Sequence, residues 1–165
     1  MKGSPESEAP AIRDELTLHL IKPRALMNVL GPFVHDYHSN VFRSQPDTKL
    51  ILLHDDLDLQ PLAVRRRSPH KSLKPYGHNG LRSVLSAVPS PRHKLIHTIG
   101  IGIGRDPDNT SKDSSAVGNW VMSPLKRAEI EACSWVSEDS QNASPHYGTV
   151  VKEVWDNVRN LMRMP

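Results

Sequence analysis

Two short polar clusters in this 165-residue sequence contain the side chains best suited to chemistry. Residues 54–59 read HDDLDL, and residues 77–83 read GHNGLRS. A carboxylate at the end of a buried strand can hold an imidazole in one tautomer and stabilise its charged form. The same residue types also occur in ordinary turns, where Asp caps the chain and Asn tolerates a left-handed backbone. The two clusters therefore indicate either a polar active site or ordinary loop chemistry.

Three residues are the main candidates within and near these clusters. Asp55 either orients an imidazole or caps the following turn. Asn28 lies in an otherwise apolar segment, so it is either a surface residue or an inward-facing amide that binds a ligand. Asn79 lies between two glycines, where a left-handed turn is the alternative to a binding role. The His and Asp residues lack the spacing of zinc sites, and we predict no metal.

The positive charge of the chain is concentrated in one stretch. Residues 59–105 contain no Asp or Glu, although the whole chain has 18 acidic residues and a net charge of only +3. Such a stretch favours an anionic partner that presents phosphates. With few aromatic residues in the stretch, recognition of backbone and shape is favoured over base stacking. The Lys and Arg residues in it are Arg65, Arg66, Arg67, Lys71, Lys74, Arg82, Arg92, Lys94 and Arg105.

The composition excludes several classes of protein. The single Cys133 cannot form an internal disulfide framework or a Cys-based zinc site. No apolar run approaches the roughly 18 residues of a membrane span. Residues 1–15 contain four acids and no apolar core, which argues against a signal or transit peptide. We therefore expect a soluble intracellular protein, in the cytoplasm or the mitochondrion, without contact with a membrane.

Hydrophobic periodicity predicts alternating strands and helices, which is typical of an α/β fold with layered architecture. We expect one domain, preceded by a disordered lead at 1–15 and followed from 137 by a linker and a C-terminal amphipathic helix. The domain itself is expected over residues 16–136. The predicted strands are 16–22, 49–55, 61–67 and 93–105. The predicted helices are 25–38 (where Pro32 either bends the helix or starts a fresh turn), 80–88, one starting near Ser123, and 149–162.

Gly100, Gly102 and Gly104 do not form a dinucleotide-binding fingerprint, because Arg105 follows and the final glycine is absent. We expect these glycines instead to allow close approach of backbone at the edge of a sheet. The sequence also contains no phosphate-binding GxxxxGK[ST] loop and no GxSxG elbow, so neither nucleotide hydrolysis nor a serine nucleophile is indicated.

Taken together, several segments resemble the bacterial-type peptidyl-tRNA hydrolase family in their order and spacing. They are LIKPRALMNVLG (20–31), HDDLDL (54–59), GHNGLRS (77–83), IGIGR (101–105) and VMSPLKRAE (121–129). The resemblance covers residues 16–135. It implies a monomeric, three-layer α/β protein with a mixed sheet between helices, which hydrolyses the ester joining a peptide to the 3′ end of a tRNA. It implies no metal or organic cofactor.

The resemblance also implies roles for residues that match the motifs. Asp55 matches the acid that orients the catalytic histidine. Asn28 and Asn79 match amides that position the substrate, with His78 beside Asn79. The basic residues around these motifs are expected to bind tRNA phosphates: Arg65, Arg66, Arg67, Lys71, Lys74, Arg82 and Arg105.

This sequence departs from the family pattern at its N-terminus. It lacks the first strand with its GNPG turn, and it lacks the RHN segment whose histidine acts as general base. Leu30 and Leu62 also occupy positions where the family has Ser and Gly. We therefore expect an N-terminally incomplete member with weak or no turnover alone, or a catalytically silent relative that binds tRNA. Replacement of the base by His19, His54 or His78 is a further alternative. A module that binds only proteins is the last alternative, and it would not bind tRNA.

Overall fold

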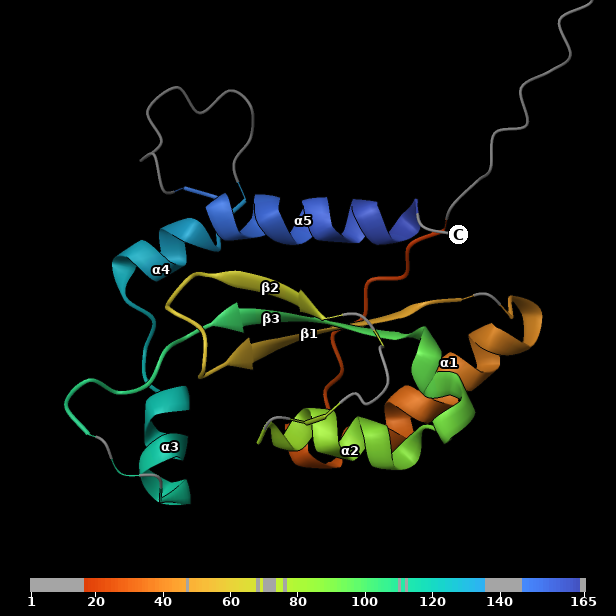
Figure 1. The fold of residues 1–165 in the computed structure, drawn as a ribbon, viewed down its shortest axis with the longest axis horizontal. Helices are drawn as coiled ribbons and strands as arrows, with labels where there is room; N and C mark the ends of the chain where they lie inside the picture. The colour runs from red at the N-terminus through yellow and green to blue at the C-terminus, as the bar shows by residue number, and fades with distance from the viewer. Residues whose placement is uncertain are drawn as a thin grey trace, which may run out of the picture.

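The computed structural model describes residues 17–46, 48–67, 69, 74–75, 77–109, 111, 113–135 and 147–163. Its strands form a three-stranded mixed sheet in the order β1-β3-β2. β1 (Leu50–Asp56) is parallel to β3 (Ile96–Gly102), and β2 (Val64–Arg67) is antiparallel to β3. Helix α5 (Thr149–Met162) covers one face of the sheet, and α1 (Gly31–Ser44) and α2 (Asn79–Ala87) cover the other (Figure 1). The prediction of an α/β fold with a mixed sheet between helices is confirmed.

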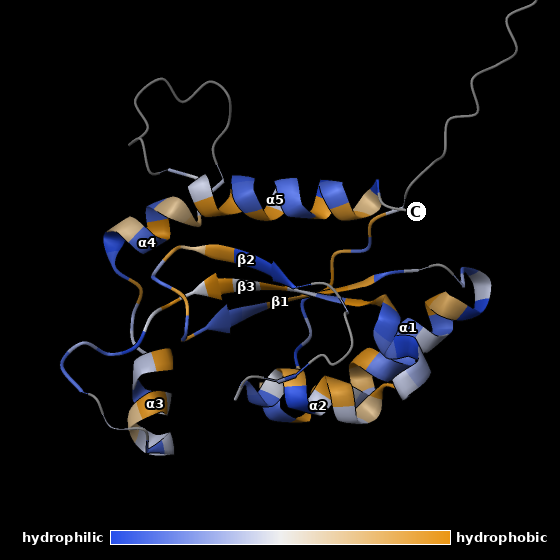
Figure 2. Ribbon diagram, viewed as in Figure 1, coloured by the Kyte–Doolittle hydropathy of each residue, from blue (hydrophilic) through white to orange (hydrophobic). Residues whose placement is uncertain are grey.

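The core forms where the apolar strands meet α1 and α2. Val34 of α1 packs with Val84 and Val88, from α2 and its C-terminal end, against Ile96 of β3. The first half of β1 joins this cluster through Leu50 and Leu52. Its second half is polar, so β1 ends in His54, Asp55 and Asp56 at the edge of the core. Figure 2 shows this change from apolar to hydrophilic residues along β1.

Helix α5 forms because its apolar residues fall on one side. Val150, Val158 and Leu161 are buried, and Figure 2 shows hydrophilic residues on the side that faces away from the sheet. Lys49 Nζ donates to the Leu161 carbonyl at 3.2 Å and so satisfies an acceptor at the end of the helix. Among the described residues, no helix has both the length and the apolar character needed to cross a membrane.

Two predicted elements near the N-terminus are corrected. The expected strand at 16–22 is wrong: residues 17–22 are not in a strand, and the apolar Leu18 and Leu20 are exposed. The alternation of residues cannot form a strand without a neighbour to supply hydrogen bonds. The expected helix at 25–38 is divided into a short 3-10 turn, η1 (Met27–Val29), and α1, which runs on to Ser44. Pro32 is the second residue of α1, and it is tolerated there because its missing N–H costs nothing in the first turn of a helix.

The observed boundaries of other elements also differ from the predicted ones. Residues 90–95 form a 3-10 turn, η2 (Ser90–Leu95), so β3 begins at Ile96, and β2 begins at Val64. Helix α3 (Ser114–Val121) was not predicted, and α4 (Arg127–Ala132) starts later than Ser123. The expected lead at 1–15 and linker at 137–146 lie outside the described residues. The division into domains stays a prediction.

The three glycines of the 100–104 segment have different neighbours: Gly102 lies against backbone, and Gly100 and Gly104 lie closest to the side chains of Asp56 and Pro61. A Cβ at Gly102 would lie 1.9 Å from the carbonyl oxygen of Gln60, so the loop after β1 lies directly on β3. The expected close approach of backbone is therefore confirmed, but β3 is the central strand of the sheet and not an edge strand. The same loop contains Leu62 at a positive φ of 67°, and its N–H donates to the Gly102 carbonyl at 2.9 Å.

Candidate active site

Asp55 and His78 form a hydrogen-bonded pair where β1 meets the start of α2. The Nε2–H group of His78 donates to Asp55 Oδ1 at 3.1 Å. His78 is also the N-cap of α2, since its Nδ1 accepts the Leu81 N–H at 3.1 Å. Because Nδ1 accepts, the ring proton must lie on Nε2, and one tautomer is fixed. Both ring nitrogens of His78 are thereby engaged, and neither is free to take a proton from water.

The electrostatics of the pair favour an ionised Asp55. The hydrogen bond from His78 holds the pKa of the Asp55 carboxyl below its usual value, and this effect exceeds the opposing effect of burial. The Asp55 side chain is 31% exposed, so solvent and ligands can reach it. The sequence predicted that Asp55 orients an imidazole, and the imidazole that it contacts here belongs to His78. The catalytic role of Asp55 stays a prediction.

A second imidazole, His54, packs against the first. The rings of His54 and His78 meet edge to face, with centroids 5.1 Å apart. His54 Nδ1–H donates to the Asp55 carbonyl at 2.6 Å, so its lone pair lies on Nε2. That Nε2 is buried and has no hydrogen-bond partner among the described residues. Burial lowers the pKa of His54, which is therefore neutral, but water does not reach its basic nitrogen.

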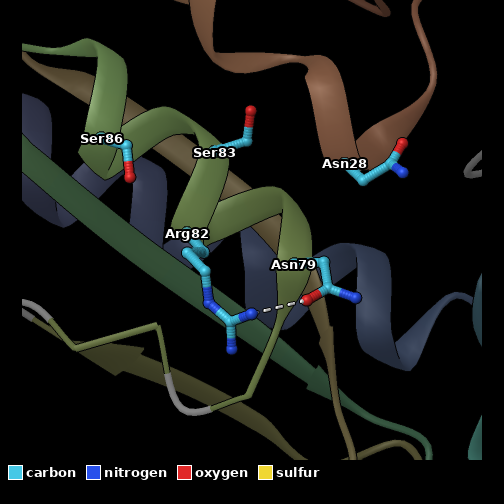
Figure 3. A pocket seen from close by; sticks show the side chains of 5 residues that line it. All are labelled: Asn28, Asn79, Arg82, Ser83 and Ser86. Atoms are coloured by element: carbon cyan, nitrogen blue, oxygen red, sulfur yellow. Dashed lines mark hydrogen bonds between the residues drawn. The ribbon is translucent and has the colours of Figure 1, made fainter. Parts of the chain in front are cut away.

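An open groove of about 420 Å³ lies along α2, whose first residue, Asn79, directly follows His78 in the chain (Figure 3). Asn28 projects from η1 on one side, and the other lining residues belong to α2. Asn79 is the first residue of α2, with an ordinary negative φ, so the left-handed turn considered for it is wrong. The sequence analysis singled out Asn28 and Asn79 separately, and the structure brings them to one groove. The lining residues are Asn28, Asn79, Arg82, Ser83 and Ser86.

The groove offers mainly hydrogen-bond donors. Arg82 Nη1 donates to Asn79 Oδ1 at 3.2 Å, which occupies the amide oxygen and leaves the amide NH₂ to face a ligand. The guanidinium of Arg82 adds a positive charge, and none of the lining residues is acidic. These groups suit a ligand with carbonyl or phosphate oxygens.

The predicted tRNA-binding residues have different environments. Arg67 forms an ion pair with the buried Asp56 at 2.9 Å, and Arg105 pairs with Asp58 at 2.6 Å. Arg65 and Lys74 are exposed, and Lys71 lies outside the described residues. The binding of tRNA by these residues stays a prediction, but the buried pairing gives Arg67 a structural role.

Sequence reasoning missed two residues of this site and one contact within it. Ser83 and Ser86 follow Asn79 at positions i+4 and i+7, so they lie on the same face of α2. That spacing would have identified them once the helix was placed. The contact of His54 with His78 had no comparable signal, because it depends on how β1 and α2 pack. The structure describes no group of three residues arranged to bind a metal.

The fold and site define a class: an α/β protein with an Asp–His pair at the C-terminal end of a parallel strand, beside an amide-lined groove. The family model described as peptidyl-tRNA hydrolase matches residues 6–163. The chain therefore belongs to the peptidyl-tRNA hydrolase family.

Individual relatives agree with this assignment. The chain is 32% identical over 127 residues to a peptidyl-tRNA hydrolase of Saccharomyces cerevisiae, covering 77% of this chain and 64% of the relative. It is 35% identical over 119 residues to one from Corynebacterium diphtheriae, covering 72% of this chain and 58% of the relative. For one from Mycobacterium tuberculosis, the identity is 36% over 114 residues, covering 69% and 54%. The chain thus spans between about half and two thirds of the length of these relatives.

Solved structures of similar fold include a peptidyl-tRNA hydrolase in complex with N-propanol. It has a TM-score of 0.47 and 22% identity, over 66% of this chain and 48% of that one. A peptidyl-tRNA hydrolase from Acinetobacter baumannii has a TM-score of 0.45 and 20% identity, over 85% of this chain and 61% of that one.

Proposed function

We propose that this chain binds peptidyl-tRNA, as a monomer, and takes part in hydrolysing the ester between the peptide and the tRNA 3′ end. The observation that carries the proposal is the placement of Asn28 and Asn79 in one groove, with Asn79 directly following His78 of the Asp55–His78 pair. Membership of the peptidyl-tRNA hydrolase family supplies the substrate class.

In the proposed reaction, the amide groups of Asn28 and Asn79 donate hydrogen bonds to carbonyl oxygens of the substrate. Water adds to the ester carbonyl carbon, the bond to the 3′ oxygen breaks, and that oxygen takes a proton as the tRNA leaves. Asp55 contributes by holding His78, and with it the start of α2 that carries Asn79. No metal or organic cofactor is needed for these steps.

The reaction also needs a base that takes a proton from the attacking water. Among the described residues, none of the three candidate histidines fits this role. His78 has both nitrogens engaged, and the free nitrogen of His54 is buried. His19 is exposed, with Nδ1 hydrogen-bonded to the Tyr37 hydroxyl at 2.8 Å, and it does not line the groove. Since loss of a general base typically lowers the rate about 10²- to 10⁴-fold, we expect weak or no turnover by this chain alone.

A second candidate function is favoured by the hydrogen bonds that both ring nitrogens of His78 already form within the protein. In this alternative, the chain binds tRNA or another structured RNA without cleaving the ester. The groove and the exposed cations would then serve binding alone, and Asp55 would act as a structural partner of His78.

The test is hydrolysis of an N-acylated aminoacyl-tRNA by the purified chain, measured beside Asp55→Asn. Turnover that the substitution abolishes would support the hydrolase and would show that a base is available within these 165 residues. Binding of the tRNA without turnover would favour the silent relative. If folded protein neither binds nor cleaves the substrate, both proposals are wrong.

A further inference from the structure

The two sides of the groove are joined by one hydrogen bond between helices. Gly31, the first residue of α1, donates its N–H to the Ser83 hydroxyl at 2.9 Å, although the two residues are 52 positions apart. The first N–H groups of a helix have no acceptor within that helix. Ser83 therefore caps α1 from a neighbouring helix.

This hydrogen bond is accompanied by direct contact. A Cβ at Gly31 would lie 2.1 Å from the Ser83 carbonyl oxygen, so the backbones of α1 and α2 meet there without an intervening side chain. A Cβ at Gly80 would lie 2.7 Å from Met27 Cγ, so η1 also packs against the first turn of α2. The segment that carries Asn28 is thus held on α2 at Met27 and at Gly31, on either side of Asn28.

We propose that Ser83 is a positioning residue, which fixes Asn28 at a set separation from Asn79 across the groove. Its hydroxyl accepts from Gly31, and its own O–H is left to donate into the groove that Ser83 lines. Ser83 thereby acts on a ligand with carbonyl or ester oxygens in two ways: it places the Asn28 amide and adds a donor. The choice of ligand rests on the proposed function.

The position of η1 can be tested without any ligand. In Ser83→Ala the Gly31 N–H loses its acceptor, and we expect its hydrogen exchange, measured by NMR, to accelerate about tenfold or more. Ser86→Ala is the matched control, because Ser86 lines the same groove but makes no contact with Gly31 among those described. Equal exchange of the Gly31 amide in wild type and Ser83→Ala would overturn the proposal.

The effect on the ligand is tested with a CCA-ended RNA hairpin, with and without an N-acetylated aminoacyl group. We expect Ser83→Ala to bind the acylated hairpin about five- to tenfold more weakly, the size of one lost hydrogen bond. Binding of the plain hairpin should be unchanged, since phosphate contacts do not depend on Asn28. Ser83→Thr, which keeps the hydroxyl, should retain most of the preference for the acylated hairpin, and Ser90→Ala, outside the groove, should match wild type.

The outcomes separate the two proposals. Failure of wild-type protein to bind either hairpin would refute the proposed function, and the exchange of the Gly31 amide would still decide the role of Ser83. If Ser83→Ala prefers the acylated hairpin as strongly as wild type does, the positioning role of Ser83 is refuted. The proposed function is then unaffected.

Discussion

At the scale of single residues, the site is defined by which ring nitrogen of His54 and of His78 carries the proton. The Leu81 N–H fixes the lone pair of His78 on Nδ1, and the Asp55 carbonyl fixes the lone pair of His54 on Nε2. The two imidazoles are in contact next to the Asp55 carboxylate, and a backbone group fixes the position of the lone pair on each.

Acid should therefore destabilise the fold through His54. Burial lowers the pKa of His54 from 6.5 in the folded chain, so below pH 6.5 the unfolded chain binds a proton that the folded chain does not. The free energy of unfolding then falls as the pH decreases through this window, by at most about 1.4 kcal/mol per pH unit for one proton. Chemical denaturation of wild type and His54→Gln between pH 7 and 5 measures this, and the variant should show the shallower dependence. An identical dependence would mean that His54 is not buried as described.

At position 62, we expect glycine to give a more stable protein than alanine, which is the reverse of their usual order. Its φ of 67° lies in the left-handed region, which costs a residue with a Cβ about 1 kcal/mol or more. Alanine and glycine both remove the rest of the leucine side chain, but only glycine relieves this strain. We expect Leu62→Gly to be more stable than Leu62→Ala by about 1 kcal/mol, as measured by urea denaturation. A more stable alanine variant would contradict the left-handed conformation.

At the scale of elements, the two edge strands are joined by an ion pair that passes over the central strand. Asp56 belongs to β1 and Arg67 to β2, and β3 lies between them. The pair passes over Gly100, where a Cβ would lie 3.0 Å from Asp56 Oδ2. A Cβ at this position of β3 would crowd the Asp56 carboxylate, so Gly100 leaves room for the ion pair that joins β1 and β2.

Removing one partner of this pair should be costly. In Asp56→Asn the Arg67 guanidinium, which is 20% exposed, loses the carboxylate that neutralises it. Breaking a buried ion pair in this way typically costs about 3 to 5 kcal/mol, although the partial exposure of Arg67 favours the lower value. Thermal and urea denaturation would measure the loss. Asp58→Asn, which breaks the exposed pair with Arg105, is the control and should cost about 1 kcal/mol or less.

The sequence predicted those elements whose pattern is local. The apolar runs of β1 and β3 and the periodicity of α5 identified these elements. An element that is buried on one or both faces has a recognisable order of apolar residues in its own short segment of sequence. The alternation at 16–22 was misleading, since a strand also needs a neighbour. The pair of Asp56 with Arg67 and the bond of Gly31 to Ser83 depend on packing between distant segments. Motifs could therefore name Asp55, Asn28 and Asn79, but not the residues that hold them in place.

At the scale of the whole molecule, the acid-free stretch predicts a salt-dependent complex with RNA. If about four phosphates are bound, affinity should fall roughly 50- to 150-fold between 50 and 200 mM salt. Titration of tRNA at several salt concentrations measures this slope. Arg65→Gln and Arg82→Gln should each reduce the slope of log affinity against log salt by about one, the value for one lost phosphate contact. Arg163→Gln, at an exposed residue just after α5, is the control and should leave the slope unchanged. A complex insensitive to salt would contradict binding through phosphates.

The pairing of both outer strands with β3 also determines when the sheet can form during synthesis. β1 and β2 precede β3 in the sequence, but in the part of the chain that the structure describes each pairs only with β3, which begins at Ile96. The two strands must therefore leave the ribosome with their hydrogen-bonding groups unpaired until more than half of the chain has been translated. Since parallel and long-range pairing is slow, this interval is when the apolar residues of β1 are most open to aggregation or to a chaperone.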